Sequence, residues 1–167
     1  MMISSVSSQH CPHQDPFLIG GIPFYAADIV RILGPMLLPA RRARIDETVA
    51  GRTYSIVPVL EGLYDRGNVS AVLRTAEALG FQSVHVIDSS MKFKEANRVT
   101  QGAEKWLDLH LWPGTVAGLA HLKRLGYRIA VTHFEEATPI DAVDFNIPTA
   151  VLFGNEKDGV SQTALDA

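Results

Sequence analysis

The sequence contains a single cysteine, Cys11, among its 167 residues. One cysteine excludes an internal disulfide framework and favours a reducing compartment, so we expect an intracellular protein, either cytoplasmic or in an organelle such as a chloroplast or mitochondrion. An excess of positive charge is also lacking, because 15 Lys and Arg stand against 18 Asp and Glu. The net charge of −3 provides no general attraction for a polyanion, so any nucleic-acid binding requires local basic clusters.

The sequence lacks an uninterrupted hydrophobic run long enough for a membrane span. Residues 17–39 are apolar, but Asp28, Arg31 and several Gly and Pro interrupt them, and we expect no membrane contact. A metal site is not expected either, because His10, Cys11 and His13 have no second pair of ligands nearby. The phosphate-binding patterns G-x-G-x-x-G and Walker A and the hydrolase pattern G-x-S-x-G are all missing, which removes support for those classes.

The regular patterns in the chain predict three parts. Residues 1–25 are expected to be a flexible tail, residues 26–52 a helical basic segment, and residues 53–167 one domain. In that domain apolar runs predict strands at 55–60, 84–87, 127–132 and 149–153, with helices at 68–79, at 115–125 and from about residue 161. Apolar strands that alternate with amphipathic helices indicate an α/β fold with a parallel sheet covered on both faces.

Ligands of such sheets bind beyond the carboxyl ends of the strands, which directs attention to the loops there. The first predicted strand leads into Asn68 and a helix with one apolar stripe that is expected to face the core, formed by Val69, Val72, Leu73, Ala76 and Leu79. Arg74 lies roughly 140° from Val69 on that helix and is not expected to be buried. From these residues alone, a helix-capping Asn68 and a solvated Arg74 are favoured over a catalytic pair.

The last predicted strand leads into a second distinctive loop. Gly154 and Gly159 allow unusual backbone conformations, and Glu156 between them offers a fixed acceptor for hydroxyl groups or an amine. This composition is typical of a ligand-binding loop.

Three sequence runs in this order resemble one protein family. They are N-V-S-A-V-L-R-T-A-E-A-L-G at 68–80, G-A-E-K-W at 102–106 and L-F-G-N-E-K-D-G-V-S at 152–161. Together they resemble the SpoU (TrmH) family of SPOUT-class RNA 2′-O-methyltransferases, over about residue 54 to the C-terminus. The resemblance implies a Rossmann-like parallel sheet of the α/β-knot type that ends in a trefoil knot, a homodimer, S-adenosylmethionine as cofactor, and tRNA or rRNA as substrate.

The resemblance also implies roles for individual residues. Asn68 and Arg74 match the first motif, whose residues act at the target ribose and phosphate, and Glu156 matches the second motif, also in the catalytic group. The implied cofactor-binding residues are Thr132, Gly154, Glu156 and Gly159. The family's third motif is expected shortly after Ala167, so we expect a C-terminally truncated, incomplete domain with half of the cofactor pocket, which is active only when extended through that motif.

The chemistry of ribose methylation explains these residue types. A 2′-hydroxyl is a weak nucleophile and needs in-line placement, a proton acceptor and stabilisation of developing negative charge. The guanidinium of Arg74 suits positioning and electrostatics, because it is almost never deprotonated and cannot serve as a base.

RNA contact requires basic residues, and two groups are candidates. The denser group comprises Arg41, Arg42, Arg44 and Arg52, to which Arg74 adds a charge at the site; the second comprises Lys92, Lys94, Arg98 and Lys105. Either group could be only a solvated surface. The alternative to an enzyme is therefore an inactive, truncated α/β domain that binds RNA or dimerises.

Overall fold

The computed structural model describes residues 15–87, 102–135 and 137–167. They belong to two compact units, one ending at Arg52 and the other beginning at Thr53, and each is considered by itself. Over the described ranges, the helices are all too short or too polar to traverse a lipid bilayer.

The unit before Thr53 contains a hairpin followed by helices. Strands β1 (Phe17–Ile19) and β2 (Ile22–Phe24) pair antiparallel. Gly20 and Gly21, with φ of 57° and 83°, make the turn, because a two-residue hairpin loop commonly needs positive φ at both positions. The hairpin occupies residues for which the sequence predicted a tail. Helix α1 (Ala26–Leu33), the short η1 (Gly34–Met36) and α2 (Pro39–Ala50) follow, as the helical patterns predicted.

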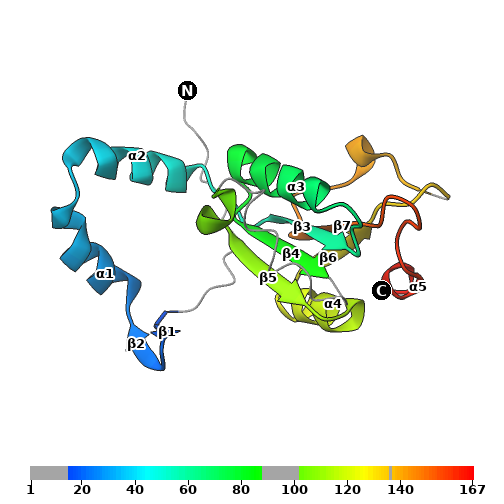
Figure 1. The fold of residues 1–167 in the computed structure, drawn as a ribbon, viewed down its shortest axis with the longest axis horizontal. Helices are drawn as coiled ribbons and strands as arrows, with labels where there is room; N and C mark the ends of the chain where they lie inside the picture. The colour runs from blue at the N-terminus through cyan, green and yellow to red at the C-terminus, as the bar shows by residue number, and fades with distance from the viewer. Residues whose placement is uncertain (1–14, 88–101, 136) are drawn as a thin grey trace. The chain divides into compact units, whose positions relative to one another are not determined.

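The unit after Arg52 is a five-stranded parallel sheet with helices on both faces (Figure 1). The strands lie in the order β5-β4-β3-β7-β6. Their bounds are β3 (Ile56–Glu61), β4 (Ser83–Ile87), β5 (Asp108–Trp112), β6 (Arg128–Val131) and β7 (Thr149–Phe153). The helices are α3 (Arg66–Leu79), α4 (Thr115–Arg124) and α5 (Gln162–Leu165), with short η3 (Ala103–Trp106) and η4 (Ile140–Ala142). The predicted α/β class and parallel sheet are confirmed.

Strand β5 was not predicted from the sequence. Its two leucines point to one face and alternate with Asp108, His110 and Trp112 on the other, so polar residues interrupt the apolar ones. The prediction relied on continuous apolar runs and therefore did not include this strand. This pattern fits its place at the edge of the sheet, where β4 is its neighbour and Ser83 pairs with Asp108.

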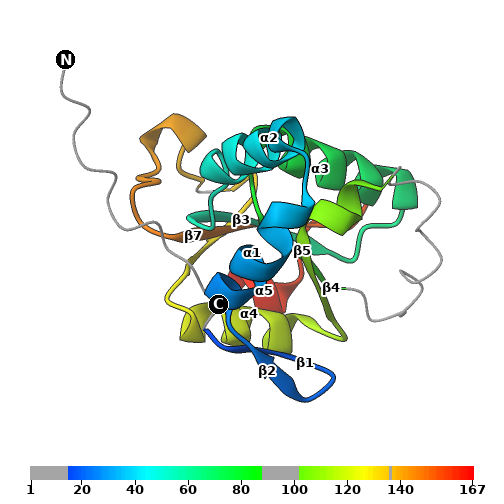
Figure 2. The ribbon, with the colours of Figure 1, turned by 90° about the vertical axis from the view of Figure 1, so that its left-hand side faces the viewer.

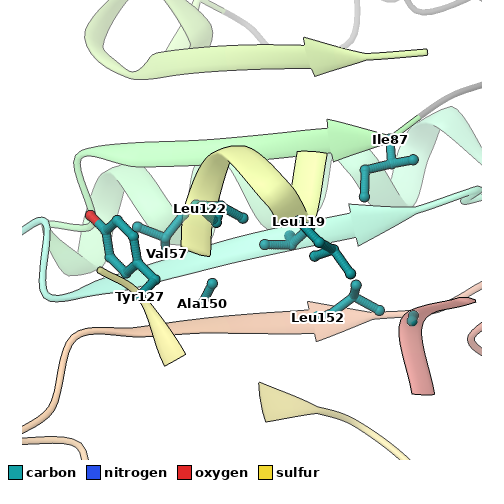
Figure 3. Packing of buried hydrophobic residues seen from close by; sticks show 9 residues of the cluster. Val57, Ile87, Leu119, Leu122, Tyr127, Ala150 and Leu152 are labelled. Atoms are coloured by element: carbon teal, nitrogen blue, oxygen red, sulfur yellow. The ribbon is translucent and has the colours of Figure 1, made fainter. Parts of the chain in front are cut away.

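Helix α3 covers one face of the sheet and α4 covers the other (Figures 1 and 2). A hydrophobic cluster fills the space under each helix. Under α4 and α5, β3 and β7 contribute side chains that meet Leu119 and Leu122 of α4 (Figure 3). Under α3, the predicted stripe is confirmed for Val69 and Leu73, which are buried against Leu60. The prediction was wrong for Leu79, which is 65% exposed because it ends the helix beyond the sheet-facing turns.

Three imidazoles and one indole share the α4 face near the sheet edge. The rings of His85 on β4 and His110 on β5 stack with centroids 4.5 Å apart, and His121 of α4 lies 4.9 Å from the ring of Trp112. The indole Nε1 of Trp112 donates a hydrogen bond to Nδ1 of His85 at 2.9 Å. To accept this bond, Nδ1 of His85 must carry no proton, so the imidazole is neutral and its proton is on Nε2.

The strand order places β3 and β7 side by side at the centre of the sheet, with Leu60 opposite Phe153. From the carboxyl end of β3 the chain enters α3 on one face, and from that of β7 it enters α5 on the other. This divergence of connections is a topological switch point, the place where open α/β sheets bind ligands.

Candidate functional site

The candidate site lies where the loops after β3 and β7 meet. The loop after β7 is closed on itself, because Asn155 and Gly159 exchange backbone hydrogen bonds of 2.7 and 2.9 Å. The side-chain Oδ1 of Asn155 accepts the backbone N–H groups of Lys157 and Asp158 at 2.8 and 3.1 Å. Gly159 has a φ of +71°, which favours glycine.

Gly154 leaves no room for a side chain. A Cβ at this position would lie 2.3 Å from the backbone carbonyl carbon of Gly159 and 2.4 Å from the nitrogen of Val160. The glycine is therefore required by the closure of the loop, and it brings Glu156 to its position above the strand ends.

Hydrogen bonds tie the two loops together. Asn155 Nδ2 donates to the carbonyl oxygen of Gly62 at 2.6 Å. Glu156 accepts twice, from Asn68 Nδ2 at 2.6 Å and from the backbone N–H of Tyr64 at 3.0 Å. Asn68 and Glu156, which stand 88 residues apart in the sequence, are thus in direct contact.

These bonds fix the charge of Glu156. The Asn68 amide, and after it the Tyr64 backbone N–H, lower the pKa of this carboxyl group to about 2. Glu156 is consequently an anion at neutral pH and a poor proton acceptor. It can hold a donor or a cation in place, but it is unsuited to remove a proton from a hydroxyl group.

Helix α3 begins two residues earlier than the sequence predicted, and the cap differs. Asp65 is the N-cap, and its Oδ1 accepts the backbone N–H of Gly67 at 2.7 Å. The interpretation of Asn68 as the capping residue was wrong, because Asp65 already serves the free N–H groups of the first turn. The side chain of Asn68 is instead available to reach across to Glu156.

Arg74 is exposed on α3 and lies outside the contact between Asn68 and Glu156. It follows Asn68 by six residues, which is about 9 Å along the helix axis. Within the described ranges Arg74 makes no hydrogen bond or ion pair. Its charge is therefore available to an external anion.

Glu61 joins three elements beneath the site and was missed by sequence reasoning. This last residue of β3 is only 7% exposed. Its carboxylate accepts the backbone N–H of Ser161 at 2.8 Å, the Ser161 hydroxyl at 2.7 Å, and the hydroxyl of Thr115 at the start of α4. The available signal was a single acidic residue at the carboxyl end of an otherwise apolar strand.

Thr132 begins the loop after β6, next to β7. Both its backbone N–H and its hydroxyl donate to the carbonyl oxygen of Leu152, each at 3.0 Å. The hydroxyl therefore anchors this loop to β7.

The candidate RNA-binding residues differ in exposure. Arg41, Arg42 and Arg44 are exposed on α2, where Arg42 lies 3.8 Å from Asp46. Arg52 is partly buried and has one terminal nitrogen shielded from solvent, so it is a weaker candidate for RNA binding than the three exposed arginines. Of the second group only Lys105 can be placed, exposed on η3, whereas Lys92, Lys94 and Arg98 lie outside the described residues.

Among the residues with described positions, no three His, Cys, Asp or Glu side chains are arranged to hold a metal ion. His10, Cys11 and His13 lie outside the described ranges.

Residues 55–167 match the model of the SpoU rRNA Methylase family. The chain is 36% identical over 127 residues to the tRNA (guanosine(18)-2′-O)-methyltransferase of Thermus thermophilus, covering 75% of this chain and 66% of that protein. It is 33% identical over 128 residues to the protein of that name from Escherichia coli, covering 76% and 56%. The chain thus spans less than two thirds of the length of these relatives.

Solved structures are similar as well. The TrmH/SpoU tRNA modifying enzyme of A. aeolicus has a TM-score of 0.67 and 27% identity, with 76% of this chain and 66% of that chain covered. A structure described as giving insights into 2-OH methylation of C/U34 on tRNA has a TM-score of 0.52 and 30% identity, with 66% and 74% covered.

Proposed function

Because this chain belongs to the SpoU rRNA Methylase family, we propose that it forms part of an enzyme that methylates a ribose 2′-hydroxyl of tRNA or rRNA, with S-adenosylmethionine as methyl donor. The observation that carries the proposal is the contact of Asn68 with Glu156 at the switch point of the sheet. The names of the Thermus and E. coli relatives, both tRNA (guanosine(18)-2′-O)-methyltransferases, support a tRNA substrate.

The residues at the ends of β6 and β7 fit a cofactor of this kind. Thr132, Gly154, Glu156 and Gly159 would hold S-adenosylmethionine, which supplies a methyl group bound to a positively charged sulfur. The fixed anion of Glu156 suits a ligand with hydroxyl groups and positive charge, and the loops at a switch point are where such ligands bind.

Asn68 and Arg74 have complementary tasks in the proposed reaction. Since Asn68 donates its amide to Glu156, its Oδ1 is directed elsewhere and can accept a hydrogen bond from the ribose hydroxyl. Arg74 supplies a permanent positive charge that can bind the neighbouring phosphate and stabilise developing negative charge on the ribose oxygen. Glu156 orients Asn68 and does not take the proton, because its pKa is too low.

We extend the proposal to the organisation of the protein. Residues 53–167 form part of a methyltransferase domain of the trefoil-knot type, and the basic segment 26–52 binds RNA through Arg41, Arg42 and Arg44. The active form is a homodimer inside the cell, in the cytoplasm or an organelle. Sedimentation at several protein concentrations measures the oligomeric state, and a monomer throughout would contradict the dimer.

Labelled methyl transfer to total RNA tests the function, in a chain that also carries the family's third motif. We expect the 2′-O-methyl product, and we expect Arg74→Ala to lower kcat by about 100-fold or more, the usual cost of removing a group that stabilises transition-state charge. Arg124→Ala on α4 is the control, since that side chain is exposed outside the site.

The outcomes separate the two candidate functions. Absence of transfer from a folded protein that still binds RNA would support the inactive, RNA-binding domain instead. Full activity of Arg74→Ala would contradict the role of Arg74 alone.

A further inference from the structure

An exposed aromatic ring lies beside the contact between Asn68 and Glu156. Tyr64, in the loop between β3 and α3, is 75% exposed, although tyrosine side chains usually bury most of the ring. Its backbone is held, because the Tyr64 N–H donates to the same Glu156 carboxylate that accepts Asn68. The chain therefore presents the ring to solvent at a fixed place next to the proposed reacting ribose.

The loop after β7 places a cation on this ring. Lys157 Nζ lies 4.5 Å from the centroid of the Tyr64 ring, within the range of a cation–π contact. The backbone of Lys157 is also fixed, because its N–H donates to Asn155 Oδ1. Since the ring remains mostly exposed with Lys157 beside it, a flat surface is left for a second ring to cover.

We propose that Tyr64 and Lys157 form a stacking site for a nucleobase of the RNA substrate, an inference that rests on the proposed function. Proteins that bind single-stranded or unpaired RNA stack bases on exposed aromatic side chains, which is favourable for every base because each has a π-face. The positive charge of Lys157 adds attraction for the adjoining phosphate. One carboxylate, Glu156, thereby aligns both the residue that contacts the ribose and the ring that holds a base.

The position of the ring favours RNA over the cofactor as its partner. Of the residues expected to hold S-adenosylmethionine, Gly154 and Gly159 lie in the loop after β7, which closes on itself with Gly154 packed against the backbone of Gly159. Tyr64 lies in the separate loop between β3 and α3 and is 75% exposed, so a large substrate has access to its ring.

The test compares Tyr64→Leu with Tyr64→Phe in steady-state methylation of tRNA and in cofactor binding. Stacking on an aromatic residue is lost in the leucine variant, so its KM for tRNA should rise roughly 5- to 100-fold, while kcat and the Kd for S-adenosylhomocysteine stay unchanged. Tyr64→Phe keeps the ring and should restore the KM. Lys157→Gln should raise the Kd for tRNA and make the dependence of that Kd on salt concentration less steep. Lys123→Gln on α4 should change neither quantity.

Three results would overturn the stacking site. They are an unchanged KM in Tyr64→Leu, a phenylalanine variant as weak as the leucine variant, and weaker S-adenosylhomocysteine binding without RNA, which would assign the ring to the cofactor. Direct binding of unmethylated tRNA separates this inference from the proposed function. If a chain that carries the third motif and no substitution binds tRNA through Tyr64 but transfers no methyl group, the proposed function fails and the stacking site stands.

Discussion

At Gly154, the backbone of Gly159 and Val160 in the loop after β7 occupies the position that a Cβ atom would take. The Cβ of an alanine would meet Gly159 at 2.3 Å, a separation that neither backbone segment can relieve without opening the loop. Since that loop carries Glu156, this one position controls whether the carboxylate reaches Asn68.

We expect Gly154→Ala to lower the free energy of unfolding by about 1–3 kcal/mol, the usual range for overpacking, and to weaken cofactor binding. Gly114→Ala is the matched control, because a Cβ at Gly114 has no neighbour within 4 Å and its backbone is extended. Urea denaturation and titration with S-adenosylhomocysteine measure the two effects. Equal behaviour of the two variants would contradict this account of the loop.

Individual site residues were predictable from the sequence when a motif contained them. The motifs identified Asn68 and Glu156, and the structure brings these two together. The role of Glu61 was hidden, because its partners Thr115 and Ser161 are distant in sequence and only the fold unites them. The cap of α3 was misplaced because Asp65 and Asn68 are both good capping residues, and their identity alone does not determine where the helix begins.

At the scale of secondary-structure elements, the side chain of Glu61 connects β3 to the starts of α4 and α5 by hydrogen bonds. Its carboxylate receives the Ser161 N–H and two hydroxyl groups, and the Ser161 hydroxyl in turn accepts the backbone N–H of Ala164 as the N-cap of α5. The start of α5 and the end of the loop after β7 are therefore fixed to β3 through one buried side chain.

Replacing Glu61 by alanine should lower the free energy of unfolding by about 2–3 kcal/mol, because the donors to a buried charged acceptor lose their partner. Glu61→Gln should be milder, since the amide oxygen can accept the Ser161 N–H while the hydroxyl groups reverse their bonds. Chemical denaturation measures both variants. Glu135→Ala, at an exposed position in the loop after β6, is the control, and a similar loss there would refute the proposed role of Glu61.

The cluster of His85, His110 and His121 on β4, β5 and α4 leads to a second prediction at the scale of elements. Burial, with smaller effects of His110 and His121, lowers the pKa of His85 to about 3. The unfolded chain binds a proton at the usual pKa of 6.5, whereas the folded protein does not, so stability must fall as the pH decreases from 6.5 toward 3.

His85→Asn should flatten this decline, because Asn Oδ1 can replace Nδ1 as the acceptor for Trp112 and does not titrate. The range between pH 6.5 and 4.5 separates the histidines from Glu156, whose ordinary pKa is 4.5. Burial lowers the pKa of His121 as well, so a smaller decline should persist in His85→Asn. Thermal unfolding across this range measures the slope. An unchanged slope in His85→Asn, with the exposed His133→Asn as control, would place the acid sensitivity elsewhere.

Most strands of the sheet could be predicted because they are largely apolar and buried on both faces, as in residues 56–60 of β3. Two kinds of element could not be predicted from the sequence. The edge strand β5 follows an alternating pattern, and the hairpin of β1 and β2 has strands of three residues, too short for periodicity to be recognised.

Across the whole molecule the net charge is −3, so binding of a polyanion requires a local cluster of positive charge. Arg41, Arg42 and Arg44 project from α2 within one turn of helix, in the unit that ends at Arg52. Such a cluster is the form in which an acidic protein can still bind a polyanion.

The double variant of Arg41→Ala and Arg42→Ala should bind tRNA more weakly and with a flatter salt dependence. The slope of log K against log salt should decrease by about 1–2, because up to two phosphate contacts are lost. Arg31→Ala in α1 is the control, since Arg31 is already paired with Asp28 at 2.9 Å. Filter binding at several salt concentrations decides the question, and parallel slopes for all proteins would rule out RNA contact by this cluster.

The central place of β7 has a consequence for the order of events during synthesis. β7 lies between β3 and β6, and the loop after it supplies Glu156, 88 residues after Asn68. A growing chain that has not yet released β7 leaves the edges of β3 and β6 unpaired and has no partner for Asn68. Contacts of such high sequence separation form slowly, so we expect the protein to bring Asn68 and Glu156 together late in folding, with the edges of β3 and β6 open to wrong pairing until then.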